Sequence, residues 1–315
     1  MLWRTAFHLL SPAGDRGRLS ILIFHRVLAR PDPLFPEEPD AARFARIMEG
    51  VARWFRVLPL SEAVARLAGN ALPARALAIT FDDGYADNHD VALPILEKLG
   101  LPATCFVATD YLDGGRMWND TVIEAVRAHP GDCLDLARLN LGTHPLAGNA
   151  ARRAAIDTLL RSIKYQPDRQ RRETVAAIAE LAGQPLPDKL MLTRAQLRDL
   201  PGRGMELGGH TCSHPILARL PDHAAQAEIA HGREALTALA GVPIRLFAYP
   251  NGKPGQDYAP RHAEMVRRAG FNAAVSTHWG AARRGSDLFQ LPRFTPWDSG
   301  LHRFAGRMAW NLIRS

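Results

Sequence analysis

The chain has 315 residues, of which 47% are apolar and 23% are charged. This balance provides enough apolar material for a sizeable core and excludes a chain that is disordered throughout. The net charge is +7, but the basic residues are spread along the chain without a nucleic-acid-binding motif, so we expect a solvated basic surface and no nucleic-acid partner.

The cysteines and the N-terminus bear on the compartment. The cysteines form no closely spaced pair, which favours reduced thiols at Cys105, Cys133 and Cys212. Residues 1–10 are apolar but are interrupted by Arg4 and His8, unlike a secretory signal or a membrane span. We therefore expect a cytoplasmic protein without a transmembrane segment. Its first residues should pack on their own domain, with a weak peripheral membrane contact as the alternative.

Apolar runs and helical periodicity alternate along the first third of the chain. Residues 20–25 predict a buried strand, and after a proline-rich loop Asp40 predicts the N-cap of a helix that runs to Trp54. The elements predicted next are a strand at 55–60, a helix at 61–67, a strand at 76–81, a helix at 91–99 that ends at Gly100, and a strand at 103–107.

Residues 112–200 interrupt this alternation, because they are rich in Ala, Arg and Leu and are typical of a helical insertion. Further strands are predicted at 206–209, 244–249, 273–276 and 288–293. Strands alternating with helices predict parallel pairing, and so an α/β barrel or an open α/β sheet, in a single domain over residues 1–315. Polar residues at the C-terminal ends of such strands are the usual functional positions.

Two adjacent carboxylates, Asp82 and Asp83, follow the strand predicted at 76–81 and precede Gly84. Burying two neighbouring negative charges is unfavourable, and a divalent cation relieves that cost. Because side chains alternate at a strand end, one carboxylate can bind the metal while the other faces the substrate. The alternative is an ordinary Asp-Asp-Gly turn.

Two histidines at metal-ligand spacing, His210 and His214, follow the strand predicted at 206–209. In a helical turn they lie on one face and can share an ion, while Cys212 faces away. Thr211 excludes the zinc-protease pattern, which requires Glu after the first His. Two histidines and one carboxylate leave coordination positions open for water and substrate, and a second carboxylate can take a proton from that water.

Residues 247–252 predict a strand that enters a Pro-Asn-Gly turn. One interpretation is a plain turn. The other is a wall of the site, in which a backbone N–H near Asn251 stabilises an oxyanion while Tyr249 and Pro250 line the pocket.

The motifs at 80–84, 210–214 and 247–252, in this order, resemble those of the polysaccharide deacetylases, carbohydrate esterase family four. The resemblance runs from about residue 21 to residue 293, apart from the insertion. It implies a distorted (β/α) barrel around one divalent metal ion, with zinc as the first choice and cobalt, nickel or iron(II) as alternatives. It also implies that Asp82 is the catalytic base and that the metal ligands are Asp83, His210 and His214.

The sequence departs from the family pattern at several positions. Many members have Arg where Ala248 stands, and the late Asp-Trp segment and the C-terminal Leu-x-His strand have no clear copy. His25 ends the first strand in the same apolar-x-His form, as in exopolysaccharide and biofilm-polysaccharide deacetylases. Because first and last strands are neighbours in a closed barrel, we expect His25 to be the general acid, with a strand-capping role or His278 as alternatives. Arg293, at another strand end, is a candidate to orient Asp82, and a surface salt bridge is the alternative.

These observations predict a metal-dependent hydrolase that removes N-acetyl groups from amino sugars. The expected partner is an N-acetylated glycan: a polysaccharide, an oligosaccharide, or a lipid- or nucleotide-linked intermediate. An amino-sugar deformylase or another amide hydrolase would use the same site. A non-catalytic carbohydrate-binding protein that keeps the fold is the alternative of a different class.

Overall fold

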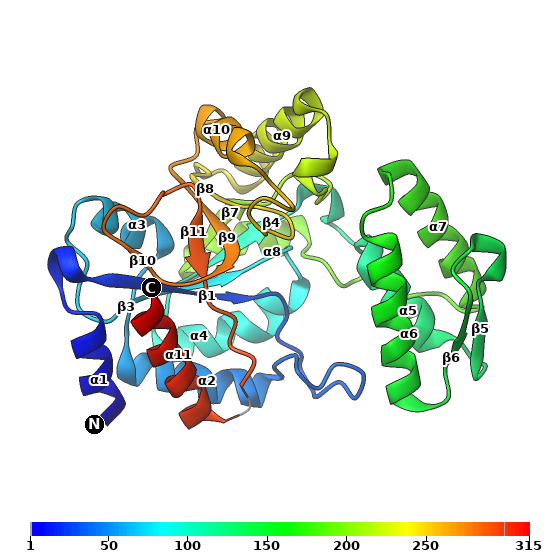
Figure 1. Cartoon of the computed structure of the whole chain (residues 1–315), viewed down its shortest axis with the longest axis horizontal. Coiled ribbons are helices and arrows are strands. Elements are labelled where there is room, and N and C mark those ends of the chain that lie inside the picture. Colours follow the sequence, from blue (N-terminus) through cyan, green and yellow to red (C-terminus); the bar gives the residue numbers. More distant parts are fainter. Residues whose placement is uncertain (1, 299) are drawn as a thin grey trace.

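The computed structural model describes residues 2–298 and 300–315, and its centre is a sheet that curls into a nearly closed barrel (Figure 1). In spatial order its parallel strands are β1 (Arg18–Phe24), β3 (Ala76–Phe81), β4 (Ala103–Val107), β7 (Met205–Gly209), β8 (Leu246–Ala248), β9 (Ala273–Trp279) and β11 (Leu291–Arg293). A bridge between Leu22 and Phe294 brings the end of β11 against β1. The structure thus confirms the distorted α/β barrel.

Two short strands differ from the sequence prediction. β2 (Arg56–Val57) pairs with β3 and replaces the longer strand expected at 55–60, because the next helix already begins at Leu60. β10 (Ala282–Arg283) pairs antiparallel with β1 and has no counterpart in the prediction.

Helices cover the outside of the barrel. The α-helices there are α1 (Leu2–Leu10), α2 (Ala41–Trp54), α3 (Leu60–Ala68), α4 (Leu93–Leu99), α8 (Arg194–Asp199), α9 (Asp222–Ala240), α10 (Pro260–Arg268) and α11 (Leu301–Arg314). Shorter turns are η1 (Gly14–Arg16), π-helical η2 (Asn88–Ala92), η3 (Thr109–Tyr111), η4 (Ala137–Leu139), η5 (Pro201–Arg203) and η6 (Leu217–Arg219). As predicted, Asp40 caps α2 by accepting a hydrogen bond from the Arg43 N–H at 2.7 Å, and Gly100 ends α4 in a left-handed conformation, at φ 64°.

Residues 118–181, which lie between β4 and β7 in the chain, form a lobe beside the barrel, drawn in green in Figure 1. Its helices are α5 (Trp118–Ala128), α6 (Gly148–Ile163) and α7 (Asp168–Leu181). It also contains an antiparallel hairpin of β5 (Cys133–Asp135) and β6 (Thr143–Pro145), which the helical prediction missed. The lobe has its own apolar cluster, which Leu34 from the loop before α2 joins.

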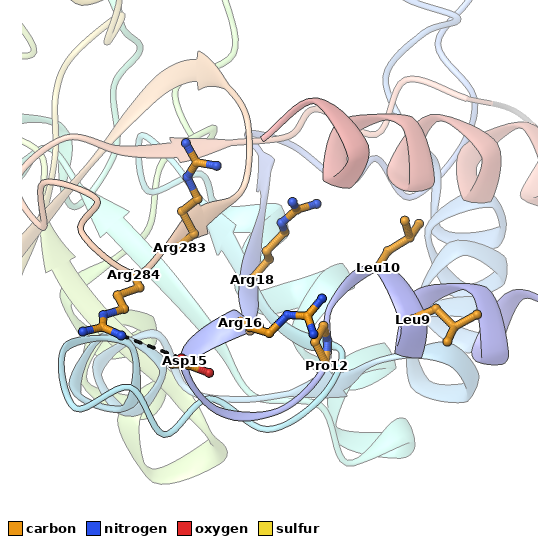
Figure 2. Close-up of a pocket in the computed structure, with 9 residues that line it drawn as sticks. Leu9, Leu10, Pro12, Asp15, Arg16, Arg18, Arg283 and Arg284 are labelled. Carbon is orange, nitrogen blue, oxygen red and sulfur yellow. Dashed lines mark ion pairs between the residues drawn. The ribbon is translucent and has the colours of Figure 1, made fainter.

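A basic cavity lies at the N-terminal end of the barrel. This cavity, of about 340 Å³, lies at the N-terminal end of β1. Figure 2 shows four arginines that line it: Arg16, Arg18, Arg283 and Arg284. Its acidic side chain, Asp15, already pairs with Arg284 at 3.7 Å.

The neighbouring α1 packs on its own domain through Phe7, which is fully buried. Among the described residues, no helix combines the length and apolar character needed to cross a bilayer.

Candidate active site

The C-terminal ends of the strands bring the predicted site residues together. One cavity of about 290 Å³ is lined by His25, Asp82, Asp83, His210, His214 and Asn251. The pairing of Phe24 with Phe81 explains part of this, because it sets the residues that follow β1 and β3 next to each other. Accordingly, the Asp82 N–H donates to the Phe24 carbonyl at 2.9 Å.

Asp83, His210 and His214 form a possible metal site. Their ligand atoms all lie within 4.8 Å of one another, and the Nε2 atom of each histidine lies 3.3 Å from Asp83 Oδ1. His210 Nδ1 lies 2.7 Å from the Ala248 carbonyl, and this contact leaves its Nε2 free to face an ion. Two imidazole nitrogens and one carboxylate are a donor set that suits zinc and leaves room for water and substrate.

The triad also has polar atoms that protein groups leave unsatisfied. Asp83 Oδ1 and His214 Nδ1 are buried and take part in no well-aligned hydrogen bond with any described residue. Burial opposes ionisation of Asp83, but the histidines outweigh it and hold the pKa of this carboxyl below its usual range. Burial lowers the pKa of His214 to about 4, so its imidazole is neutral at neutral pH. An anionic carboxylate beside a neutral imidazole fits a cation site.

The histidine segment is not the helical turn that the spacing predicts. His210 follows β7 directly, and residues 211–214 form a loop in which Thr211 (φ 67°) and His214 (φ 56°) are left-handed. Left-handed backbone is unfavourable for residues other than glycine, and it persists where the surroundings hold it. The histidines therefore converge through loop geometry. Cys212 still faces away from the triad, and its sulfur lies 3.7 Å from the Glu228 carbonyl.

Helix α9 supports this loop through two residues that the sequence analysis did not identify. The Glu228 carboxylate accepts hydrogen bonds from the N–H groups of Cys212 and Ser213, both at 2.9 Å, and from the Ser213 hydroxyl at 2.8 Å. One turn further, a Cβ atom on Gly232 would lie 2.8 Å from the Thr211 carbonyl carbon. The loop that carries the two histidines thus depends on a carboxylate and a glycine one helical turn apart.

Asp82, in the wall of the cavity, pairs with Arg293 behind it. The guanidinium makes two parallel contacts of 2.7 Å with the two carboxylate oxygens, and Arg293 is fully buried. Burial opposes ionisation of Asp82, but the charge of Arg293 outweighs it, so the pKa of Asp82 is lowered. Arg293 therefore contacts Asp82 in a buried pair and does not form the surface salt bridge that was its alternative role.

His25 lies at the exposed edge of the cavity, and the segment after the Asp-Asp motif holds its loop. Asn88 donates to the His25 carbonyl at 2.9 Å, while Asp87 accepts hydrogen bonds from the Val27 N–H at 3.1 Å and from Arg26 Nε at 2.8 Å. The alternative acid, His278, is exposed on β9 and does not line the cavity.

The turn after β8 places only part of its predicted set in the cavity. Asn251, at φ 61°, lines it, and among the described residues its N–H donates to no hydrogen-bond acceptor. Tyr249 and Pro250 do not line the cavity. The Tyr249 side chain is fully buried, stacks on Tyr258 with 3.7 Å between ring centroids, and donates to the Phe289 carbonyl at 2.9 Å. The prediction that this ring lines the pocket is therefore wrong.

The remaining wall comes from the lobe and from β9. Its residues are Trp118, Asn119, Leu160, Arg161, Lys164 and Thr277. The lobe thus contributes to the cavity, which helical periodicity alone did not predict.

A family-wide sequence model described as polysaccharide deacetylase matches residues 69–130 and 163–274, more than half of the chain. YxkH of Bacillus subtilis (strain 168), described as a candidate polysaccharide deacetylase, is 20% identical over 278 residues, which span 88% of this chain and 71% of YxkH.

Solved structures show the same fold. The Streptococcus pyogenes deacetylase PplD in complex with acetate is 18% identical, with a TM-score of 0.61, over 94% of this chain and 98% of PplD. IcaB from Ammonifex degensii is 19% identical, with a TM-score of 0.61, over 96% of this chain and 98% of IcaB.

The triad geometry predicts about one divalent ion per wild-type chain, because the three ligand atoms lie within 4.8 Å of one another. His210→Ala should lose the ion, whereas His278→Ala should keep it. Elemental analysis after reconstitution with zinc, cobalt, nickel or iron(II) would check this. Equal metal content in wild type and His210→Ala would contradict the site.

Gly232→Ala should weaken metal binding by about tenfold or more, since its methyl group would displace the backbone at Thr211. Gly306→Ala is the matched control: it lies on α11, and its added Cβ would meet Trp3 only at an ordinary 3.9 Å. Zinc affinity from chelator competition measures both. An unchanged affinity in Gly232→Ala would show that α9 does not set the ligand geometry.

Proposed function

The chain belongs to the polysaccharide deacetylase family and is an amide hydrolase that acts on N-acetyl groups; from this premise we propose that it deacetylates an amino sugar with one divalent ion, zinc first, at Asp83, His210 and His214. The substrate we propose is a polysaccharide, an oligosaccharide or a lipid- or nucleotide-linked glycan. The observation that carries the proposal is the Asp82–Arg293 pair beside the triad, in a cavity that also contains His25 and Asn251.

Asp82 is proposed as the general base. Arg293 fixes both of its oxygens in one orientation and favours the ionised form, which is the form that accepts a proton. The metal, when bound, would polarise the acetamide carbonyl and lower the pKa of water. Asp82 then takes a proton from the water that attacks the carbonyl carbon.

The other side of the reaction needs an oxyanion donor and an acid. The backbone N–H of Asn251 is proposed to stabilise the oxyanion, since it faces no other acceptor among the described residues. His25 is proposed to donate a proton to the leaving nitrogen as the C–N bond breaks. Water is thereby added across the amide, and the products are acetate and a free amine.

Asp82→Asn should lower acetate release by about 10²- to 10⁴-fold while metal content stays at the wild-type level, because the amide cannot accept the proton. Acetate released from N-acetylated oligosaccharides by the metal-loaded protein is the measurement. Wild-type turnover in Asp82→Asn would refute the base assignment. Formate from N-formyl sugars without acetate would favour the deformylase, and no product at all would favour the binding protein.

Arg293→Gln should shift the acid limb of the kcat/KM profile to higher pH. As the pH falls, activity is lost once Asp82 becomes protonated. Because Arg293 lowers the pKa of Asp82, removing this cation raises that pKa, and protonation then occurs at a higher pH. Arg293→Lys keeps the charge and should leave the limb nearer its wild-type position. Since an unpaired buried carboxylate costs about 3–5 kcal/mol, folding of each variant is checked by thermal unfolding. An acid limb that coincides in all three proteins would show that Arg293 does not tune Asp82.

A further inference from the structure

A second cavity of about 290 Å³ adjoins the catalytic one. The two share His25, Asp83 and Asn119 in their walls, so they meet at the proposed acid and at one metal ligand. Each alone is at the small end of ligand pockets, which begin at about 300 Å³, and a continuous pair suits a ligand longer than one sugar.

The cations of this second cavity are already neutralised. Arg127 contacts both oxygens of Asp32, at 3.0 and 2.6 Å, and also lies 3.2 Å from Glu124. Arg26 pairs with Asp87 at 2.8 Å and lies over the Tyr85 ring, 4.9 Å from its centroid.

Two further carboxylates in the wall form no close ion pair with a described residue, although the charge of Arg26 acts on both from a distance. Asp120, which is 4% exposed, accepts hydrogen bonds from the Tyr85 hydroxyl, at 3.0 and 3.2 Å, and from the Met117 N–H at 3.2 Å. The Glu38 side chain lines the cavity and forms no hydrogen bond with a described residue, and only the more distant charges of His25, Arg26 and Arg43 oppose the effect of its burial. Burial raises the pKa of both carboxyl groups, that of Asp120 to about 6. Burial thus makes these charges costly unless a cation lies close by. The wall as a whole contains five carboxylates and two arginines: Asp32, Glu38, Asp83, Asp120 and Glu124 against Arg26 and Arg127.

We propose that this cavity binds a neighbouring sugar of the same glycan that carries a free ammonium group, with Glu38 as the specificity-determining residue. A hydrogen-bonded ammonium would give Glu38 and Asp120 a cation in direct contact, which no described side chain provides. An acetylated nitrogen is neutral and bulkier, so it fits this charge less well. The inference rests on the proposed function, because the ammonium is the product that deacetylation leaves on an adjacent unit. Each turnover then makes the next sugar a better substrate.

The test compares the metal-loaded enzyme on fully acetylated N-acetylglucosamine oligomers and on oligomers of the same length in which one neighbouring unit is de-N-acetylated. Wild type should show a kcat/KM about tenfold higher on the oligomer with the free amine. Glu38→Gln, which keeps the shape of the side chain, should reduce this ratio to near one. Glu37→Gln is the matched control, because Glu37 points to the surface and pairs with Arg153, and it should keep the wild-type ratio.

A direct binding measurement separates this inference from the proposed function. Glucosamine disaccharide binding, followed by calorimetry on the metal-loaded protein, should weaken about tenfold in Glu38→Gln and not in Glu37→Gln. Equal ratios in wild type and Glu38→Gln, or equal affinities for the disaccharide, would overturn the inference while acetate release still supports the proposed function. No acetate from any oligomer, with charge-dependent disaccharide binding intact, would refute the hydrolase and leave the cavity assignment standing.

Discussion

The buried contact between Arg293 and Asp82 ties the barrel to its site. Arg293 ends β11 and Asp82 follows β3, two strands on either side of β1. The same guanidinium also donates to the Ser276 carbonyl at 2.8 Å and to the Thr80 hydroxyl at 3.2 Å. A buried ion pair is favourable only when its remaining donors and acceptors are satisfied, and here neighbouring strands satisfy them. The same side chain therefore links the neighbouring strands of the barrel and orients the Asp82 carboxylate.

The adjacent carboxylate, Asp83, has no comparable cationic side chain. It occupies left-handed backbone at φ 77°, as do Thr211, His214 and Asn251 around the same cavity. Such backbone is maintained only where other contacts outweigh its cost. Around the histidine loop those contacts come from Glu228 on α9. The site is thus a set of left-handed turns held in place by contacts from outside it, and these turns bring Asp83 and the two histidines together as a possible metal site.

Much of the wall of the two cavities comes from segments outside the barrel. The lobe and the loop before α2 share one apolar cluster, so the two segments pack against each other. Between them they supply most of the wall of the second cavity. This division is common in α/β proteins, where a rigid scaffold positions the reacting groups and the connecting segments decide what enters.

The sequence by itself determined the alternation of strands and helices, the capped start of α2 at Asp40, the end of α4 at Gly100, and the motif residues that converge at the strand ends. These features are local: periodicity, capping and turn chemistry are properties of a few neighbouring residues. Only the tertiary structure decided that the His210–His214 segment is a left-handed loop, that Tyr249 belongs to the core, and that Glu228 and Asn88 hold the loops of the site. Those outcomes depend on contacts between residues far apart in the chain, and such contacts leave no periodic signal because each partner is selected by its position in space.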